Sequence, residues 1–141
     1  MNVNILLHRI NSISKINPNL GLEIDVRDYE NNLVLSHDPP PGSEQLLDDF
    51  LKHIDKNQLL AINVKSNEIE NQLKLDLDQN NIKNYFTFNW SVPSLSKALN
   101  IKLSCAFRLS EYEQLSKINC SGLWIDAFHS IGYDETIDTT S

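Results

Sequence analysis

Short β-rich runs alternate with segments of helical periodicity along most of the 141-residue chain. The runs contain β-branched and aromatic residues, or are short apolar stretches bounded by polar residues, which is typical of strands. They predict strands at 3–7, 22–26, 33–36, 59–64, 85–88, 103–107 and 123–127.

Four segments between these strands have apolar residues at helical spacing or a helix-start signal. Ser43 precedes one apolar face, and the segment at 91–99 has a proline in its first turn. The sequence SEYE has the serine and glutamate spacing of a capping box. We therefore expect helices at 43–54, 66–80, 91–99 and 110–117.

Alternating strands and helices predict an α/β fold, with a parallel sheet and helical crossovers. One connection breaks this pattern, because Asn31 and Asn32 leave no room for a crossover helix. The strands at 22–26 and 33–36 are therefore expected to form a hairpin, whose second strand need not join the main sheet. Residues 1–128 are predicted to form one domain, and 129–141 a disordered or truncated tail.

Composition and charge restrict the function classes. No stretch reaches the roughly 18 apolar residues of a membrane span, and the first residues lack signal-peptide features, so a cytoplasmic location is expected. A formal charge of −7 argues against nucleic acid as a partner. Cys105 and Cys120 lack the spacing of a zinc site or disulfide framework, and buried free thiols are the simpler interpretation.

Two carboxylates alternate along the strand at 22–26. Successive strand side chains switch faces, so Glu23 and Asp25 share one face and Ile24 lies on the other. Oxygen ligands suit Mg²⁺ or Ca²⁺, and this pair could supply part of a metal shell. The alternative interpretation is a solvated strand face.

Histidines and cations follow other strands. His8 and Arg9 come after the first, and His37 after the third. Imidazole titrates in the range needed for acid and base catalysis, although a single histidine is more often structural. Lys65 shares a face with Asn63 and suits a phosphate oxygen, but a strand-end lysine also often extends its ammonium into solvent.

Polar residues therefore recur at strand ends that are distant in sequence, as in a TIM-barrel-like fold, where the site lies at the carboxyl ends of the strands. Asn89, Trp90 and Asp126 extend this pattern. Arg9, Lys65 and Arg108 would give an otherwise acidic protein an anion-attracting substrate-binding mouth.

The order HR, EID, SHDPP and then a strand ending in lysine resembles glycerophosphodiester phosphodiesterases, within the phospholipase-C-like barrel phosphodiesterases. The resemblance implies that His8 and His37 form the acid/base pair, with Arg9 and Lys65 on phosphate. It also implies a divalent metal on Glu23 and Asp25, and no organic cofactor. The implied activity is hydrolysis of a glycerophosphodiester or a related lipid or sugar phosphodiester, through a cyclic phosphate intermediate.

Asn63 stands where the family usually has a third metal-binding acid; an amide oxygen can still bind a metal, but more weakly. The chain also supplies only about six βα units, whereas a closed barrel has about eight. The sequence therefore predicts an incomplete barrel, whose open strand edges suggest a homo-oligomer, a missing C-terminal portion or instability. An alternative function follows, namely a catalytically inactive domain that binds a phosphate ligand.

Overall fold

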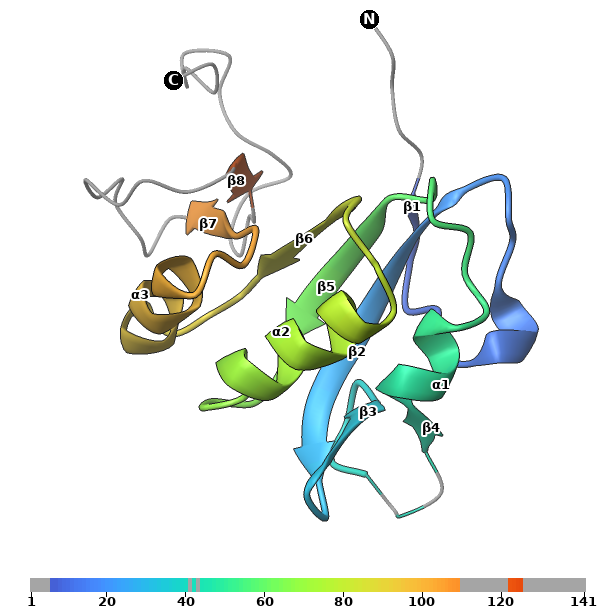
Figure 1. Cartoon of the computed structure of the whole chain (residues 1–141), viewed down its shortest axis with the longest axis horizontal. Helices are drawn as coiled ribbons and strands as arrows, with labels where there is room; N and C mark the ends of the chain where they lie inside the picture. Colours follow the sequence, from blue (N-terminus) through green and yellow to red (C-terminus); the bar gives the residue numbers. More distant parts are fainter. Residues whose placement is uncertain (1–5, 41, 43, 110–121, 126–141) are drawn as a thin grey trace, which may run out of the picture.

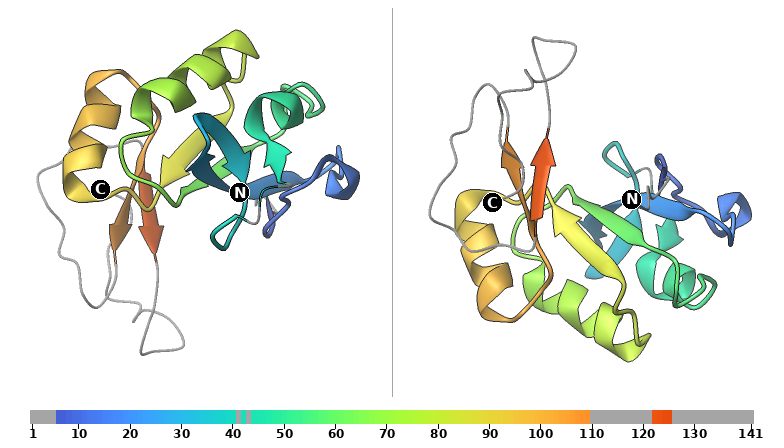
Figure 2. Two further views of the ribbon diagram at one scale, coloured as in Figure 1. Left: turned by 90° about the horizontal axis from the view of Figure 1, so that it is seen from below. Right: turned by 90° about the horizontal axis from the view of Figure 1, so that it is seen from above.

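The structure is a computed structural model that describes residues 6–40, 42, 44–109 and 122–125. Six strands form one mixed sheet in the order β4-β3-β2-β5-β6, with β1 pairing to β2 outside this path. A second sheet has two parallel strands, which lie side by side in Figure 2. The strands are β1 (Leu6–Leu7), β2 (Gly21–Tyr29), β3 (Asn32–Leu35), β4 (Gln45–Leu46), β5 (Leu60–Val64), β6 (Tyr85–Phe88), β7 (Ala106–Leu109) and β8 (Gly122–Ile125).

Within the described residues, three short α-helices accompany these strands: α1 (Leu47–Leu51), α2 (Glu70–Gln79) and α3 (Val92–Asn100). The 91–99 helix is confirmed almost to the residue, because Ser91 caps it by accepting a hydrogen bond from the Ser94 amide. The helix expected at 43–54 is shorter, since its first part pairs as β4. The helix expected at 110–117 lies outside the described residues, as does the 129–141 tail.

The TIM-barrel-like prediction is wrong. The described residues form a small α+β domain with a mixed sheet, instead of about six repeated βα units. The connection between β1 and β2 contains only the 3-10 helix Ile13–Lys15, and α1 has five residues. Neither provides the full crossover helix that each barrel unit needs.

The expected hairpin is confirmed and explains the mixed sheet. Strand β2 reverses into β3 through Glu30 and Asn31, whose φ angles are +48° and +67°. A two-residue turn of this kind joins only antiparallel strands. The sequence left open whether β3 joins the main sheet; it does, and β4 pairs antiparallel to it.

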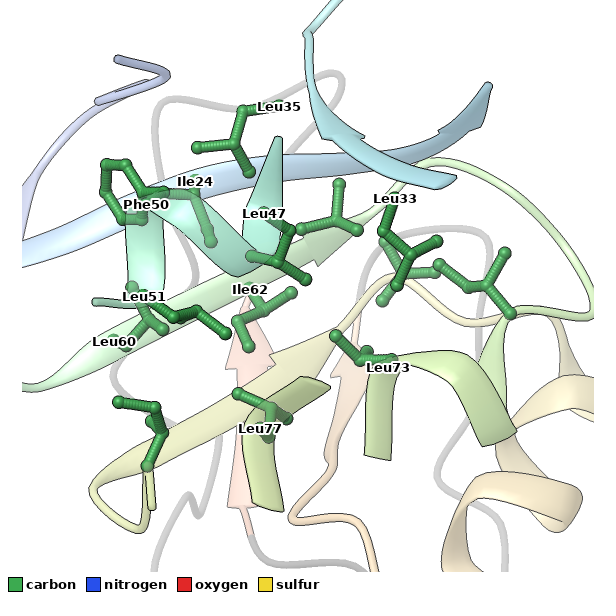
Figure 3. Close-up of a cluster of buried hydrophobic side chains, with 14 of the residues drawn as sticks. Ile24, Leu33, Leu35, Leu47, Phe50, Leu51, Leu60, Ile62, Leu73 and Leu77 are labelled. Atoms are coloured by element: carbon green, nitrogen blue, oxygen red, sulfur yellow. The ribbon is translucent and has the colours of Figure 1, made fainter. Parts of the chain in front are cut away.

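Helices α1 and α2 cover one face of the sheet (Figure 1). The apolar side chains of β2 and β5 on that face interlock with both helices (Figure 3). Each fully buried leucine or isoleucine contributes about 1.5–3 kcal/mol relative to an exposed one. This core fixes the position of β2, and it includes Ile24, Leu33, Leu47, Phe50, Leu51, Ile62, Leu73 and Leu77.

Two further expectations concern single features. Cys105 is buried as expected, and its thiol donates to the Leu103 carbonyl at 3.4 Å, whereas Cys120 lies outside the described residues. Within the part of the chain that the structure describes, no helix combines the length and apolar character that crossing a membrane requires.

Candidate functional site

The opposite face of β2 carries polar side chains, and we call it the polar face. It comprises Glu23 and Asp25 of β2 and Asn63 of β5, with Lys65 directly after β5. The parallel register places Asp25 beside Asn63. Glu23 is 7% exposed and Asp25 is fully buried. The predicted alternation along β2 is therefore confirmed, but these carboxylates are buried rather than solvated.

Asp25 is held by two amide side chains and a lysine. Its Oδ2 accepts a hydrogen bond from Asn11 Nδ2 at 3.0 Å, and its Oδ1 accepts one from Asn63 Nδ2 at 3.0 Å. Lys65 Nζ lies 4.0 Å from the same Oδ1. A buried carboxylate needs such partners, since an unpaired one would be costly to desolvate.

The amide network continues towards β6. Asn89 Nδ2 donates to Asn63 Oδ1 at 3.1 Å, so Asn63 directs its nitrogen at Asp25 and its oxygen at Asn89. Asn89 has a φ of +71°, in the left-handed region that asparagine tolerates better than most residues. This conformation ends β6 and leads the chain into α3.

Several charged groups near Glu23 affect the pKa of its carboxyl. Burial raises the pKa of its carboxyl above the ordinary value, and the neighbouring Asp25 raises this pKa further. His8, Arg9 and Lys65 lower the pKa of Glu23 through their positive charge. His8 Nε2 lies 3.3 Å from Glu23 Oε1, with the imidazole 64% exposed. Five charged or titratable residues from three separate segments thus converge.

One edge of β2 brings both predicted histidines to this level of the sheet. Strand β1 pairs with the start of β2, and β3 pairs with its end. In the gap between them, the Ile10 amide donates to the Glu23 carbonyl and the Ser36 amide donates to the Asp25 carbonyl. The segments carrying His8 and His37 are therefore bonded to neighbouring positions of one strand.

Arg27 fixes the segment that carries His37. Its guanidinium donates to the carbonyl of His37 at 2.7 Å, and to the carbonyl of Ser36 at 3.2 Å. The His37 ring contacts Asp38, with 3.1 Å between Nδ1 and Oδ1. Arg27 thus orients the main chain at His37, and the Asp38 carboxylate lies within hydrogen-bonding distance of the His37 ring.

An open pocket of about 340 Å³ lies beyond the carboxyl ends of β5 and β6. We call it the Trp90 pocket. Lys65 and Asn89 belong both to its wall and to the network around Asp25. The pocket therefore adjoins the polar face, and it is lined by Val64, Lys65, Ser66, Asn67, Asn89, Trp90 and Ser91.

Some predicted site residues are not brought into this cluster by the described contacts. Arg108 lies in β7, which pairs with β8 rather than with β2 or β5, and its expected role in substrate binding stays a prediction. Asp126 lies outside the described residues. The resulting site rests on β1, β2, β5 and the strand ends beside them.

The donor set does not fit the expected divalent metal. Two amide N–H groups and an ammonium group already surround Asp25, and a divalent cation would have to displace them. Among the described residues, no group of three or more histidine, cysteine, aspartate or glutamate side chains is arranged to hold a metal ion. Asn63 directs its nitrogen, not its oxygen, at Asp25.

Two contributors were missed from the sequence, and the role of a third was not recognised. Arg27 continues the alternation of Glu23 and Asp25 by one more step, so the strand pattern contained its signal. Asn11 lies in a connecting segment 14 residues before Asp25, where no periodicity points to it. Asn89 was noted only as a strand end, although it completes the amide network.

Comparison with known proteins adds no family. No family model matches the chain, and no curated protein sequence matches it at a significant level.

Proposed function

We propose that this domain binds a small-molecule phosphodiester and hydrolyses it by acid/base catalysis on the polar face. The observation that carries the proposal is the convergence of His8, Arg9, Asp25 and Lys65 around Glu23. It places an imidazole and two cations at one buried carboxylate pair. Cleavage of a phosphodiester needs a proton acceptor, a proton donor and positive charge on the phosphate oxygens.

His8 is suited to act as the base. An ionised Glu23 accepts only, so the facing Nε2 of a neutral His8 carries the proton and Nδ1 keeps its lone pair. In the first step, Nδ1 takes the proton of a substrate hydroxyl, whose oxygen attacks phosphorus. A cyclic phosphate forms, and the bond to the leaving oxygen breaks.

His37 is suited to act as the acid. Its Nδ1 lies 3.1 Å from Asp38 Oδ1, so a protonated ring that donates Nδ1–H to Asp38 keeps Nε2–H available to the leaving oxygen. In the second step the roles reverse, because neutral His37 activates water and protonated His8 returns its proton to the ring-opened hydroxyl. Arg27 acts as a positioning residue by holding the main chain at His37.

Lys65 and Arg9 are suited to hold the phosphate. The Lys65 side chain is 20% exposed, so its ammonium reaches both Asp25 and the Trp90 pocket. Arg9 has a φ of +53° directly after His8, which turns the chain at the mouth of the site. Positive charge placed where phosphate charge develops stabilises the transition state.

The direct test is hydrolysis of bis(p-nitrophenyl) phosphate and of glycerophosphocholine by the full chain, with and without a chelator. Activity is expected in wild type. His8→Ala and His37→Ala should each lower it by about 10²–10⁴-fold, the usual contribution of a general acid or base. His53→Ala is a matched control, because His53 is exposed and its ring contacts the Asp49 carbonyl. Wild-type rates equal to those of both histidine variants would contradict the proposal.

A second candidate function is phosphate-ligand binding without turnover. The hydrogen bonds around Asp25 favour this second function, because amide N–H groups occupy the positions where a divalent metal was expected to bind. Binding of inorganic phosphate that depends on Lys65, together with no hydrolysis at any metal concentration, would support this candidate. The cytoplasmic location and the association through strand edges stay predictions.

A further inference from the structure

We infer that Lys65 takes the place of a divalent cation on the polar face, with its ammonium group bridging Asp25 and the phosphate of the ligand. The inference rests on the proposed recognition of phosphate, and it identifies the positive charge that the site uses. The observation behind it is the arrangement of donors around Asp25, which presents N–H groups where a divalent metal prefers oxygen ligands.

The Asn11 side chain forms two hydrogen bonds with Asp25. Its Nδ2 donates to Asp25 Oδ2 at 3.0 Å, and its Oδ1 accepts from the Asp25 main-chain amide at 2.9 Å. Turning the amide group by half a rotation would break both bonds, because it would place oxygen against oxygen and N–H against N–H. Asn11 is therefore fixed with its nitrogen, not its oxygen, towards the carboxylate.

The Asn63 amide is fixed from its other end. Its Nδ2 donates to Asp25 Oδ1 at 3.0 Å, and its Oδ1 accepts from Asn89 Nδ2 at 3.1 Å. Each oxygen of the Asp25 carboxylate thus accepts a hydrogen bond from an amide whose orientation is set by a second bond. A divalent metal at Asp25 would have to break this arrangement on both oxygens.

Lys65 supplies the charge that the neutral amides lack. Its Nζ lies 4.0 Å from Asp25 Oδ1, and a fully buried carboxylate such as Asp25 needs an opposite charge to offset its desolvation. The Lys65 side chain is 20% exposed and also lines the Trp90 pocket. An ammonium group has three N–H donors, so it can contact a phosphate oxygen on its open side while it keeps Asp25 as its partner.

Glu23, the second carboxylate of the polar face, has a different partner. Its Oε1 lies 3.3 Å from His8 Nε2. The ligands of one metal ion would converge on a single cation, whereas Glu23 and Asp25 each have a nitrogen partner of their own. The two carboxylates are therefore arranged as members of two pairs rather than as one ligand set.

Calorimetric titration of the full chain with calcium, magnesium or manganese chloride tests the counter-charge. Wild type should show no saturable binding at millimolar metal, because Lys65 already balances Asp25. Lys65→Met removes the ammonium and leaves only neutral amides to be displaced, so it should bind at least one of these metals at least about tenfold more tightly than wild type. Lys56→Met is the matched control, since Lys56 is exposed and lies outside the polar face, and it should behave as wild type.

Titration with inorganic phosphate tests the bridge. Wild type should bind phosphate equally well with and without a chelator, since no metal takes part. Lys65→Met should weaken phosphate binding by at least about tenfold, because it removes a charge-assisted hydrogen bond. Lys65→Arg keeps the positive charge and should retain most of the binding.

The outcomes separate this inference from the proposed function. Metal binding to wild type that Asp25→Asn abolishes, or no gain of metal binding in a folded Lys65→Met variant, would overturn the role of Lys65 while leaving the proposed hydrolysis intact. If Lys65→Met does not fold, the wild-type titrations and Lys65→Arg decide. If wild type binds no phosphate, the proposed function is wrong, and the bridge with it.

Discussion

Strand β2 presents two buried faces with opposite chemistry. Towards the helices, Leu22, Ile24 and Val26 are fully buried in an apolar core, and on the polar face Glu23 and Asp25 are at most 7% exposed. The apolar side chains stabilise the domain through the hydrophobic effect, and any aliphatic residue of similar volume would serve. The carboxylates require hydrogen-bond and ion-pair partners, so the same degree of burial is favourable on the apolar face and costly on the polar face unless those partners are present.

The difference teaches where to look for function. A buried polar network is retained at a cost that a hydrophobic replacement would avoid, and such costs concentrate at functional sites. Here the network includes Asn11, Asn63, Lys65 and Asn89 in addition to Asp25. The following changes test whether the two faces differ as described.

The largest effect on stability is expected on the apolar face. Ile24→Ala should lower the free energy of unfolding by about 2–5 kcal/mol, because it leaves a cavity in the packed core. Urea unfolding followed by circular dichroism measures the change. Leu75→Ala is the control, since Leu75 is 49% exposed on α2. Similar losses in both variants would show that this face is not the stabilising core.

A smaller loss is expected on the polar face. Asp25→Ala leaves the Asn11 and Asn63 amides without their acceptor, which should cost about 1–3 kcal/mol in the same unfolding assay. Asp28→Ala, on the same strand but exposed, should change stability by less than about 0.5 kcal/mol. A stabilised Asp25→Ala domain would instead mean that the network is maintained at the expense of stability.

Asn63→Asp should create a metal site that wild type lacks. A third acid beside Glu23 and Asp25 adds repulsion without a cation and supplies an oxygen ligand for Ca²⁺. Thermal unfolding with and without Ca²⁺ measures the gain, about 1.4 kcal/mol at ten times the dissociation constant. Wild type should show none of it. Equal stabilisation of both proteins by Ca²⁺ would contradict the fit of the donor set described above.

The smallest effect concerns pH. Burial raises the pKa of Glu23 in the folded state, so the folded protein holds this proton more tightly than the unfolded chain does. The contribution of Glu23 to stability is therefore most favourable below its ordinary pKa of 4.5 and declines as pH rises through the folded pKa. Glu23→Gln should flatten this decline in unfolding curves measured at several pH values. Glu68→Gln is the control: Glu68 is exposed, so this variant should leave the decline of stability with pH unchanged. If the decline is also unaltered in Glu23→Gln, it arises from another titratable group.

Local features of the fold could be predicted from the sequence. Period-two alternation located β2, the short Asn31–Asn32 connection predicted the hairpin, and Ser91 marked the start of α3. Each depends on residues close together in the chain. The barrel could not be inferred safely, because polar strand ends occur in mixed sheets as well, and the length of a crossover helix is decided by tertiary packing.

The site was predictable in part for the same reason. The charges of His8, Glu23, Asp25 and Lys65 were recognised from their strand positions, and the structure brings them together. The amide partners were not, since Asn11 reaches Asp25 from a connecting segment and the orientation of the Asn63 amide depends on Asn89. Spacing along the chain does not encode these long-range hydrogen bonds, so the N–H donors that surround Asp25 could not be predicted.

The gap in the edge of β2 has a consequence for motion. The Ile10 and Ser36 amides donate to adjacent stretches of this strand, and the Asp25 amide donates to Asn11 Oδ1. Three segments that are remote in sequence are thus joined by hydrogen bonds at one place on the edge of β2. Opening of that edge would release the His8 and His37 segments together, so the amide protons of Ile10, Asp25 and Ser36 should exchange with solvent as one cooperative unit.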